Sequence, residues 1–440
     1  MTANAAASKN EPASGRRKIG GRVLWCRDPS AGDRCLPYEV LRSKAGILDL
    51  MGRWPEALEL FQGNIALGEA ASRADIAGIN EHDLGRVLID MGRYDEALDH
   101  LERAKRLLGQ TGDEAAATKA DATIGIVYWF RGELDRAIAA LEPLIPVYER
   151  LGDRVALSNI LNNLANAVAD RGDRPGAERY YQEQIAICRE TGHLDGLQRG
   201  LGNLGIMRYL AGDYRAALGL YREKLAISER LGNRKSSGIA IGNIGLIYAD
   251  QGRFEEALEW YERKRAICRA LDDRLELAIV TGNIGTVHQR HGEHEAALAK
   301  FLETIAQLKA LGAKYHLAEF LFRAADAALR LGDQVRAAGL CGEARQVAAE
   351  MNQREIGEYA AVVECRIQAA ADPAGTRARL EMMLAQAADG TLVALLHHEL
   401  FRLTGDAGHR RAALEKYRAL YAITPFIEHR LAIEELERTT

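Results

Sequence analysis

Residues 242–258, Gly-Asn-Ile-Gly-Leu-Ile-Tyr-Ala-Asp-Gln-Gly-Arg-Phe-Glu-Glu-Ala-Leu, decide the fold because versions of this stretch recur along the chain. Related Gly-Asn-Leu-Gly and Gly-Asn-Ile-Gly phrases begin at Gly202 and Gly282, forty residues to either side. Self-similarity at a fixed period of this size is typical of a solenoid built from stacked supersecondary units. We therefore take the repeat as the unit of structure.

Three sequence registers recur eight times with this period. A glycine stands at Gly52, Gly92, Gly132, Gly172, Gly212, Gly252, Gly292 and Gly332. An alanine follows each of these glycines five residues later, and a small residue, Ala or Gly, precedes each by seven. Glycine can adopt the positive φ that ends a helix, and small residues let two helices cross closely. Each repeat is thus predicted to hold helix A before the glycine and helix B after it.

The pattern resembles the tetratricopeptide repeat family. The residues that carry the resemblance are Ile244-Gly245 and Tyr248 of helix A, the turn glycine Gly252, and Ala257 of helix B. The usual family period is ~34 residues, and the longer period here is similar to that of the spindle-orientation adaptor LGN. Residues 161–165 resemble the corresponding phrase of kinesin light chains. The resemblance implies an all-α, right-handed superhelical solenoid whose A helices line a concave groove.

The repeat register divides the chain into four predicted parts. Residues 1–36 are predicted to be a disordered or loosely docked tail, on the basis of their composition. Eight regular repeats are expected in residues 37–350, with the helix B that begins at Arg174 the least regular. Residues 351–424 follow the register only loosely, and we interpret them as degenerate repeats. Residues 425–440 are predicted to form the polar capping helix that a solenoid end requires.

Composition excludes several classes of function. The net charge is −4, so there is no basic excess of the kind that nucleic-acid binders carry. No apolar run reaches the length of a membrane helix. The six cysteines form no Cys-x-x-Cys pair, which suits a reducing, cytoplasmic location. The sequence leaves the oligomeric state and the identity of the partner open.

A row of asparagines is the main candidate for binding. One helix A position holds Asn163, Asn203, Asn243 and Asn283 in four consecutive repeats. The position lies ~130° from the apolar stripe of helix A, and the resemblance implies that it faces the groove. An amide offers two donors and an acceptor, which suits the backbone of an extended peptide. Asn166 adds a further amide to the same region.

Three glycines accompany this row, since Gly202, Gly242 and Gly282 each precede one of the asparagines. We expect these glycines to leave the groove floor bare, so that a ligand backbone can come close. The alternative is structural: the asparagines hydrogen-bond between neighbouring helices and only fix the superhelix.

Charged residues near the row are candidates for setting sequence preference. Asp170 and Asp250 share one helix A position, and Arg290 holds it in a later repeat. Arg199 and Arg323 lie on nearby helical turns. The pattern suggests a groove that is acidic in the middle and basic toward its C-terminal end. The alternative is an ordinary solvated helix face.

No catalytic or metal-binding set is predicted. His288 and His294 stand where other repeats carry Tyr248 and Phe254, so we interpret them as aromatic substitutes and not as metal ligands. No phosphate-binding loop and no nucleophile–base arrangement occurs. We predict a protein without a cofactor that is not an enzyme.

The predicted function is a protein–protein adaptor that binds an extended segment of a partner in the concave groove. An alternative is a peptide-responsive regulator whose superhelix changes on ligand binding. A further alternative is that the tail around Trp25 occupies the groove.

Overall fold

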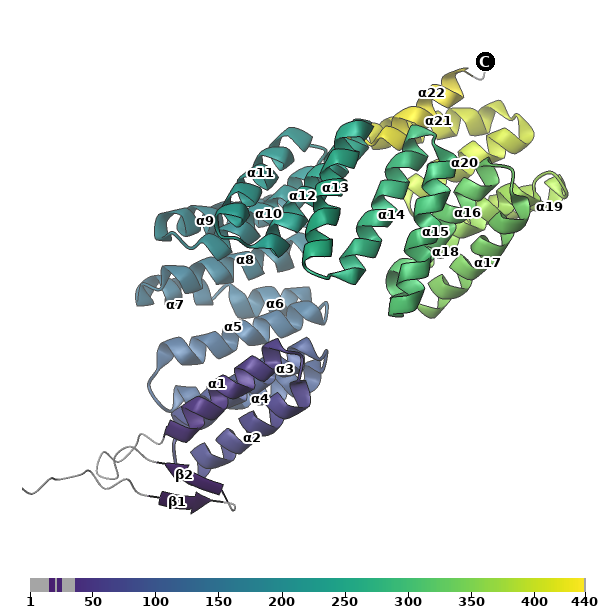
Figure 1. The fold of residues 1–440 in the computed structure, drawn as a ribbon. Helices are drawn as coiled ribbons and strands as arrows, with labels where there is room; N and C mark the ends of the chain where they lie inside the picture. Colours follow the sequence, from purple (N-terminus) through teal and green to yellow (C-terminus); the bar gives the residue numbers. More distant parts are fainter. Residues whose placement is uncertain (1–15, 20–21, 26–35, 439–440) are drawn as a thin grey trace, which may run out of the picture. The chain divides into compact units, whose positions relative to one another are not determined.

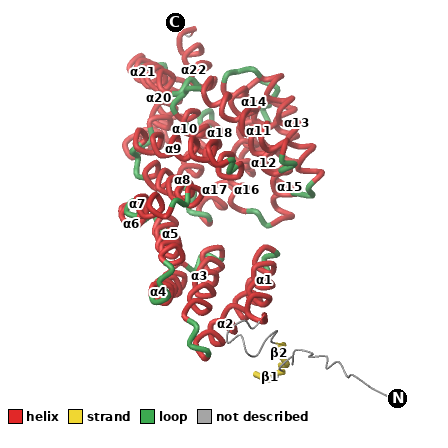
Figure 2. Tube along the Cα trace, turned by 90° about the vertical axis from the view of Figure 1, so that its left-hand side faces the viewer, coloured by secondary structure: helices red, strands yellow, loops and turns green. Residues whose placement is uncertain are grey.

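The computed structural model describes residues 16–19, 22–25 and 36–438, and the chain divides into two compact units between Gly196 and Leu197. The strands β1 (Arg16–Ile19) and β2 (Arg22–Trp25) pair as an antiparallel hairpin, which the sequence analysis did not predict. The remainder of the predicted N-terminal tail lies outside the described residues. All other described elements are helices joined by short turns (Figure 2).

The helices of the first unit are α1 (Leu36–Leu50), α2 (Trp54–Ala70), α3 (Ala74–Asp90), α4 (Tyr94–Gly109), α5 (Glu114–Phe130), α6 (Leu134–Leu141), α7 (Leu144–Leu151), α8 (Arg154–Asp170) and α9 (Arg174–Thr191). Those of the second unit are α10 (Leu194–Leu210), which begins just before the division, α11 (Tyr214–Arg230), α12 (Arg234–Asp250), α13 (Phe254–Ala270), α14 (Arg274–His291), α15 (His294–Leu311), α16 (Lys314–Arg330), α17 (Gln334–Glu350), α18 (Arg354–Gln368), α19 (Pro373–Gln386), α20 (Gly390–Thr404), α21 (Ala407–Ile423) and α22 (Ile427–Arg438). Apart from the β1–β2 pair in the first unit, each unit is a solenoid of helix pairs, as predicted. The pairs α14–α15 and α16–α17 are followed most easily in Figure 1.

The turn glycines end the A helices in the predicted way. All eight have a positive φ, from +70° at Gly52 to +95° at Gly172. A side chain at such a φ is strained, whereas glycine adopts it freely. The same device ends most B helices, and Asp272, which replaces a glycine there, has a φ of +50°.

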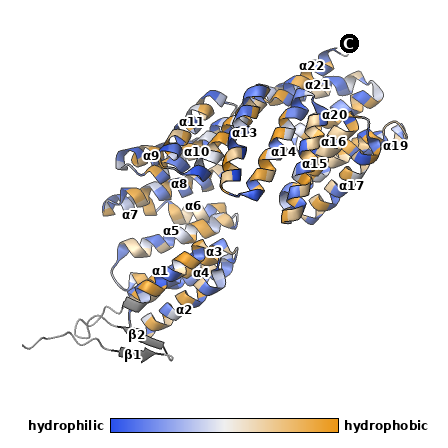
Figure 3. Cartoon of the chain, viewed as in Figure 1, coloured by the Kyte–Doolittle hydropathy of each residue, from blue (hydrophilic) through white to orange (hydrophobic). Residues whose placement is uncertain are grey.

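The small residue of helix A packs against the large residue of helix B. A Cβ placed on Gly205 would lie 2.6 Å from the Tyr221 ring, and one on Gly285 would lie 2.8 Å from the Phe301 ring. The glycine therefore makes room for the aromatic ring and sets how closely the two helices approach. Figure 3 shows orange apolar residues alternating with blue polar residues along the helices.

The least regular helix B is not the one that the sequence predicts. The helix B that begins at Arg174 was predicted to be the least regular, but α9 is a continuous helix with its proline in the first turn, where no backbone N–H is needed. The interrupted helix B is that of the third repeat. There, α6 stops and α7 begins again after Pro143, because a mid-helix proline removes a hydrogen bond and clashes with the preceding turn.

The buried seam predicts a graded response to truncation on α15. Phe301 is fully buried, whereas its neighbour Leu302 is 36% exposed. Phe301→Ala should lower the free energy of unfolding by about 3–5 kcal/mol through lost burial and a cavity. Leu302→Ala should change it by less than about 1 kcal/mol. Denaturant unfolding of both variants checks this, and equal losses would contradict the assignment of the seam.

Candidate functional site

The helix A face of the first unit contains a cleft. Its volume is about 620 Å³, and α1, α3 and α5 contribute its walls. Ser43 and Asp83 line it, and they hold the repeat position that Asn203 and Asn243 hold later in the chain. The repeat position that the sequence singles out therefore borders a cleft. The residues that hold this position in the cleft, Ser43 and Asp83, are not among the predicted site residues.

A polar network crosses this cleft from one A helix to the next. Arg42 Nε donates to Asp83 Oδ2 at 2.6 Å, and His82 Nδ1 lies 3.3 Å from Asp83 Oδ1. On its other side, His82 Nε2 lies 3.0 Å from the Thr123 hydroxyl. Burial raises the pKa of Asp83, but its bonds to His82 and Arg42 outweigh burial and hold the pKa at about 2. The cleft therefore keeps a fixed negative charge beside a guanidinium.

The asparagines of the row are half-buried, and those with described bonds contact their own chain. Asn163 Oδ1 lies 3.5 Å from the Asn162 amide nitrogen, and Asn166 accepts a hydrogen bond from the Tyr181 hydroxyl at 2.5 Å. On α12, Asn243 hydrogen-bonds the hydroxyl of Tyr221.

Asn203 on α10 and Asn283 on α14 are half-buried like the others. The bond from Asn243 to Tyr221 is of the kind that the structural alternative expects, although it joins helix A to the preceding helix B and not to another helix A.

The glycines beside the row do not leave the helix backbone uncovered. The expectation that a ligand backbone could come close to them was therefore wrong. A Cβ on Gly202 would lie 2.8 Å from Lys224 Nζ, and one on Gly242 would lie 3.0 Å from Lys264 Cδ. The space at Gly282 is taken by the ring of Phe320. All three glycines are buried because side chains from neighbouring helices fill the room that they leave.

The predicted charged residues occupy different surroundings. Asp170 is exposed and accepts a hydrogen bond from the Trp129 indole at 2.6 Å. Arg199 is exposed on α10. Arg323 is half-buried on α16, where it pairs with Glu319 at 3.0 Å.

Of the ten predicted residues, the structure joins Asp250 and Arg290 directly. Arg290 Nη1 donates to Asp250 Oδ1 at 2.9 Å, and the Tyr209 hydroxyl donates to Asp250 Oδ2 at 2.7 Å. Arg290 Nε also donates to Glu428 of α22, and Phe426 lies beside Tyr209 with ring centroids 6.1 Å apart. The two charges compensate each other, so at this pair the expected separation into an acidic middle and a basic end is not present.

Burial changes the protonation of this cluster. Asp250 is 1% exposed, and burial raises its pKa to about 6 although Arg290 and Tyr209 act in the opposite direction. Burial lowers the pKa of Arg290, but Glu428 and Asp250 raise it by more. The arginine therefore stays charged between two carboxyl groups, and Asp250 is the group of this cluster that titrates near neutral pH.

The segment leading into α22 rests on two of the turn glycines. A Cβ on Gly212 would lie 2.6 Å from the Ile423 carbonyl oxygen, and one on Gly252 would lie 2.9 Å from Ile427 Cδ1. The other six turn glycines have no such neighbour within 4 Å: Gly52, Gly92, Gly132, Gly172, Gly292 and Gly332. The second unit thus holds a segment of its own chain against the ends of its A helices.

A second charged network holds the far end of α22. Arg366 donates to Asp326 at 2.6 Å and to Glu399 at 2.8 Å. Arg402 bonds Glu399 at 2.9 Å and continues to Glu435 of α22 at 2.6 Å. Helix α22 is therefore tied to α14 by Glu428 and to α20 by Glu435.

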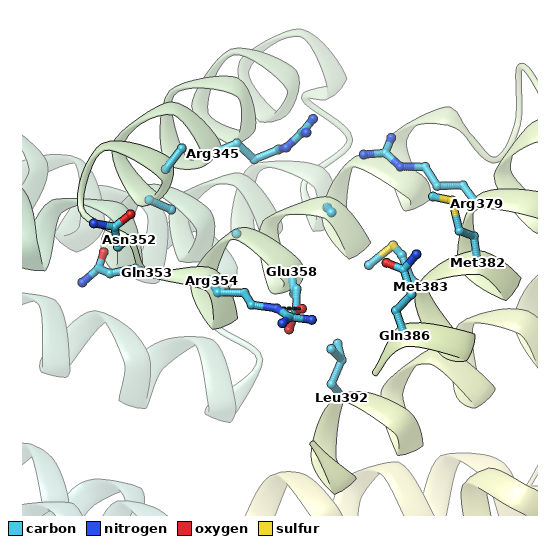
Figure 4. A pocket seen from close by; sticks show the side chains of 14 residues that line it. Arg345, Asn352, Gln353, Arg354, Glu358, Arg379, Met382, Met383, Gln386 and Leu392 are labelled. Carbon is cyan, nitrogen blue, oxygen red and sulfur yellow. Dashed lines mark hydrogen bonds and ion pairs between the residues drawn. The ribbon is translucent and has the colours of Figure 1, made fainter. Parts of the chain in front are cut away.

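A cavity of about 530 Å³ lies among α17, α18, α19 and α20. Figure 4 shows Arg345 and Arg379 pointing toward one another across it, with Met382 and Met383 beside Arg379. Both guanidiniums bond Glu364, at 2.6 Å and 2.7 Å. Arg354 and Glu358 also line the cavity and pair with each other at 2.8 Å. With Glu364, three positive charges thus stand against two negative charges.

Two small residues in the sequence give a signal for this cavity. Gly357 and Ala361 line it, and forty residues earlier the same positions hold the buried Leu317 and Leu321. The loss of two leucine side chains leaves the space unfilled.

Two features are absent from the described residues. No described helix combines the length and the apolar character needed to cross a membrane. Within residues 16–19, 22–25 and 36–438, no group of three or more His, Cys, Asp or Glu side chains is arranged to hold a metal ion.

Comparisons with known proteins agree with the repeat architecture. A family model described as tetratricopeptide repeat matches residues 38–110, 114–190, 157–230 and 236–310, together more than half of the chain. A second model with the same description matches residues 203–267. No curated protein matches the chain.

Solved structures with similar folds come from several proteins. One is a Signal Transduction ATPase with Numerous Domains with a tetratricopeptide repeat sensor from Pyrococcus horikoshii, at 16% identity and a TM-score of 0.57, covering 89% of this chain and 54% of that one. Another is the quorum sensor NprR from B. thuringiensis, at 15% identity and a TM-score of 0.56, covering 77% and 99%. A third is aspartyl phosphate phosphatase F from Bacillus subtilis, at 16% identity and a TM-score of 0.50, covering 71% and 83%. This chain spans about half the length of the Pyrococcus protein, and at these identities the likeness shows the fold alone.

The buried carboxyl group predicts a pH-dependent stability. Because the pKa of Asp250 is about 6 when folded and near 3.8 when unfolded, the folded state binds more protons between these values. The contribution of Asp250 to the free energy of unfolding should therefore fall as the pH rises from about 4 to about 6, by up to about 3 kcal/mol. Asp250→Asn should remove this dependence in denaturant unfolding across that range. Asp170→Asn, at the same repeat position but exposed, should leave the wild-type profile unchanged; identical profiles for all three proteins would contradict the assignment.

Proposed function

Because this chain belongs to the tetratricopeptide repeat family, we propose that it is an adaptor that binds an extended segment of a partner protein on its helix A face. The observation that carries the proposal is the cleft of about 620 Å³ bounded by α1, α3 and α5. It is lined at the repeat position for which the sequence predicts binding, through Ser43 and Asp83. Asn163 holds that position in a later repeat of the first unit and extends the proposed contact surface there. Asn203, Asn243 and Asn283 hold it in the second unit.

The chemistry of the cleft suits a peptide backbone with mixed side chains. The Arg42–Asp83 pair places a donor and an acceptor side by side, and exposed Arg86 and Lys119 add positive charge at the edge. Ser43 offers both a donor and an acceptor. Several such contacts spread over a pre-formed surface give useful affinity without a large cost of ordering the protein.

A steric variant tests the cleft. Gly46 lies on α1 and lines the cleft, and a Cβ placed there meets nothing within 4 Å, so Gly46→Trp should fill the cleft without disturbing the fold. Gly63 on α2 has equally open surroundings but does not line the cleft, so Gly63→Trp is the matched control. Peptides are first selected on the full-length protein from a displayed library of random sequences.

The expected result is that selected peptides lose affinity about tenfold or more on Gly46→Trp, since one lost anchor of about 1.4 kcal/mol has that effect. They should bind Gly63→Trp as they bind the wild type. The cleft is not the binding surface if both variants keep wild-type affinity, and the adaptor proposal fails if no peptide is selected.

A second candidate function is a peptide-responsive regulator, and the seating of α22 favours it. The segment from Ile423 to Glu428 already occupies the ends of α10, α12 and α14 through the turn glycines and Arg290. A partner peptide that competes for these contacts would release α22. Binding would then change the conformation of the second unit.

Two alanine variants test whether α22 depends on the turn glycines. Gly252→Ala and Gly292→Ala introduce the same backbone strain, since φ is +74° and +86°, but only Gly252 faces α22. Gly252→Ala should therefore speed hydrogen–deuterium exchange in residues 427–438, whereas Gly292→Ala should not. Equal exchange in the two variants would remove the case for a releasable helix.

A further inference from the structure

A lysine of α11 is buried without a partner. Lys224 is 8% exposed, and among the described residues no charged group acts on its ammonium. The ammonium rests against bare backbone, because a Cβ on Gly202 of α10 would lie 2.8 Å from Lys224 Nζ. Burial lowers the pKa of Lys224, and no neighbouring carboxylate counteracts it. A buried cation without a counter-charge is costly, so its surroundings are expected to supply one.

A second donor without an acceptor lies on the same face of α10. Gln198 stands one helical turn before Gly202 and is 4% exposed. Its Oε1 accepts hydrogen bonds from the Ser228 hydroxyl at 2.7 Å and the Ser236 hydroxyl at 2.6 Å. Its Nε2 is buried and has no partner among the described residues. The region thus presents an ammonium and an amide N–H, both of which lack an acceptor.

The next repeat shows which group completes such a site. Lys264 occupies the position of Lys224 and lies against Gly242 in the same way, with Nζ 3.3 Å from a Cβ placed there. Its ammonium pairs with Glu276 Oε2 at 2.8 Å. The residue forty positions before Glu276 is Ser236, which carries no charge. The repeat of Lys224 therefore contains the cation and the glycine but lacks the carboxylate.

We propose that Lys224 and Gln198, above Gly202, form a subsite for a carboxylate of a bound partner, supplied by an aspartate or glutamate side chain. A charge-assisted hydrogen bond from the ammonium and a second bond from the amide would hold it. The partner carboxylate takes the place that Glu276 fills one repeat later. This inference rests on the proposed adaptor function, but the site can be tested without the partner.

The first test measures Lys224 directly in the full-length protein. Lysines are labelled with 13C at Cε, the Lys224 resonance is assigned with Lys224→Met, and N-acetylglutamate is added as the probe. The probe should shift the Lys224 resonance and raise the pKa of Lys224, and it should leave the resonance of Lys264, whose site is filled, in place. Inorganic phosphate serves as a second arm. A resonance that responds to phosphate and not to N-acetylglutamate, or to neither, would overturn the carboxylate assignment.

The second test supplies the carboxylate within the chain. Ser236→Glu copies the arrangement of Lys264 and Glu276, so it should raise the pKa of Lys224 and abolish the response to N-acetylglutamate. It should also raise the melting temperature relative to the same change made in a Lys224→Met background. If Ser236→Glu leaves the probe response intact, the site is not where we place it.

A partner peptide separates this inference from the function on which it rests. For a selected peptide that contains an acidic residue, Lys224→Met should weaken binding about tenfold or more, as expected for loss of one charge-assisted bond. Lys264→Met should leave the affinity unchanged. If a peptide binds tightly and Lys224→Met does not weaken it, the adaptor proposal stands and the subsite proposal fails. If N-acetylglutamate shifts the Lys224 resonance but no peptide binds, the subsite proposal stands and the adaptor proposal fails.

Discussion

The close approach of helix A to helix B, set by one small residue against one large residue, is the constraint on which the rest of this structure depends. At Gly205 and Gly285 there is no room for a side chain, because the rings of Tyr221 and Phe301 occupy it. Bulk at either glycine would push the helices of the pair apart. Repetition of this contact every forty residues keeps the A helices in register, and the register brings equivalent side chains to the same face.

That register explains why charged groups can be buried on the helix A face. Arg290 lies one repeat after Asp250, close enough to compensate its charge, and Arg366 stands in the same relation to Asp326. Removing one partner of such a pair is costly because the other charge is left buried. On helix B, Lys224 differs from these pairs, since it is buried without a carboxylate. This contrast with Lys264 identifies Lys224 as a candidate for contact with another molecule.

Much of the fold could be predicted from the sequence, and less of the candidate site. The turn glycines, the helix pairs and the contact of small with large residues follow from local periodicity, and the structure confirms them. The asparagine position was identified, but the members that line a cleft are Ser43 and Asp83. The bare floor expected at Gly202 was wrong because a side chain from another helix fills the space, and a pattern within one helix does not reveal its neighbours.

The sequence by itself determined where the A helices of the regular repeats end and which face of a helix is apolar, because backbone strain at glycine and helical periodicity act over a few residues. Only the tertiary structure decided that Glu428 reaches Arg290, 138 residues away, and that α22 covers Gly252 but not Gly292. It also decided that Gly357 and Ala361 open a cavity. These features depend on which surfaces of the second unit meet after the chain has curved back on itself. That curvature is the sum of small differences between many repeats, which no short stretch of sequence reveals.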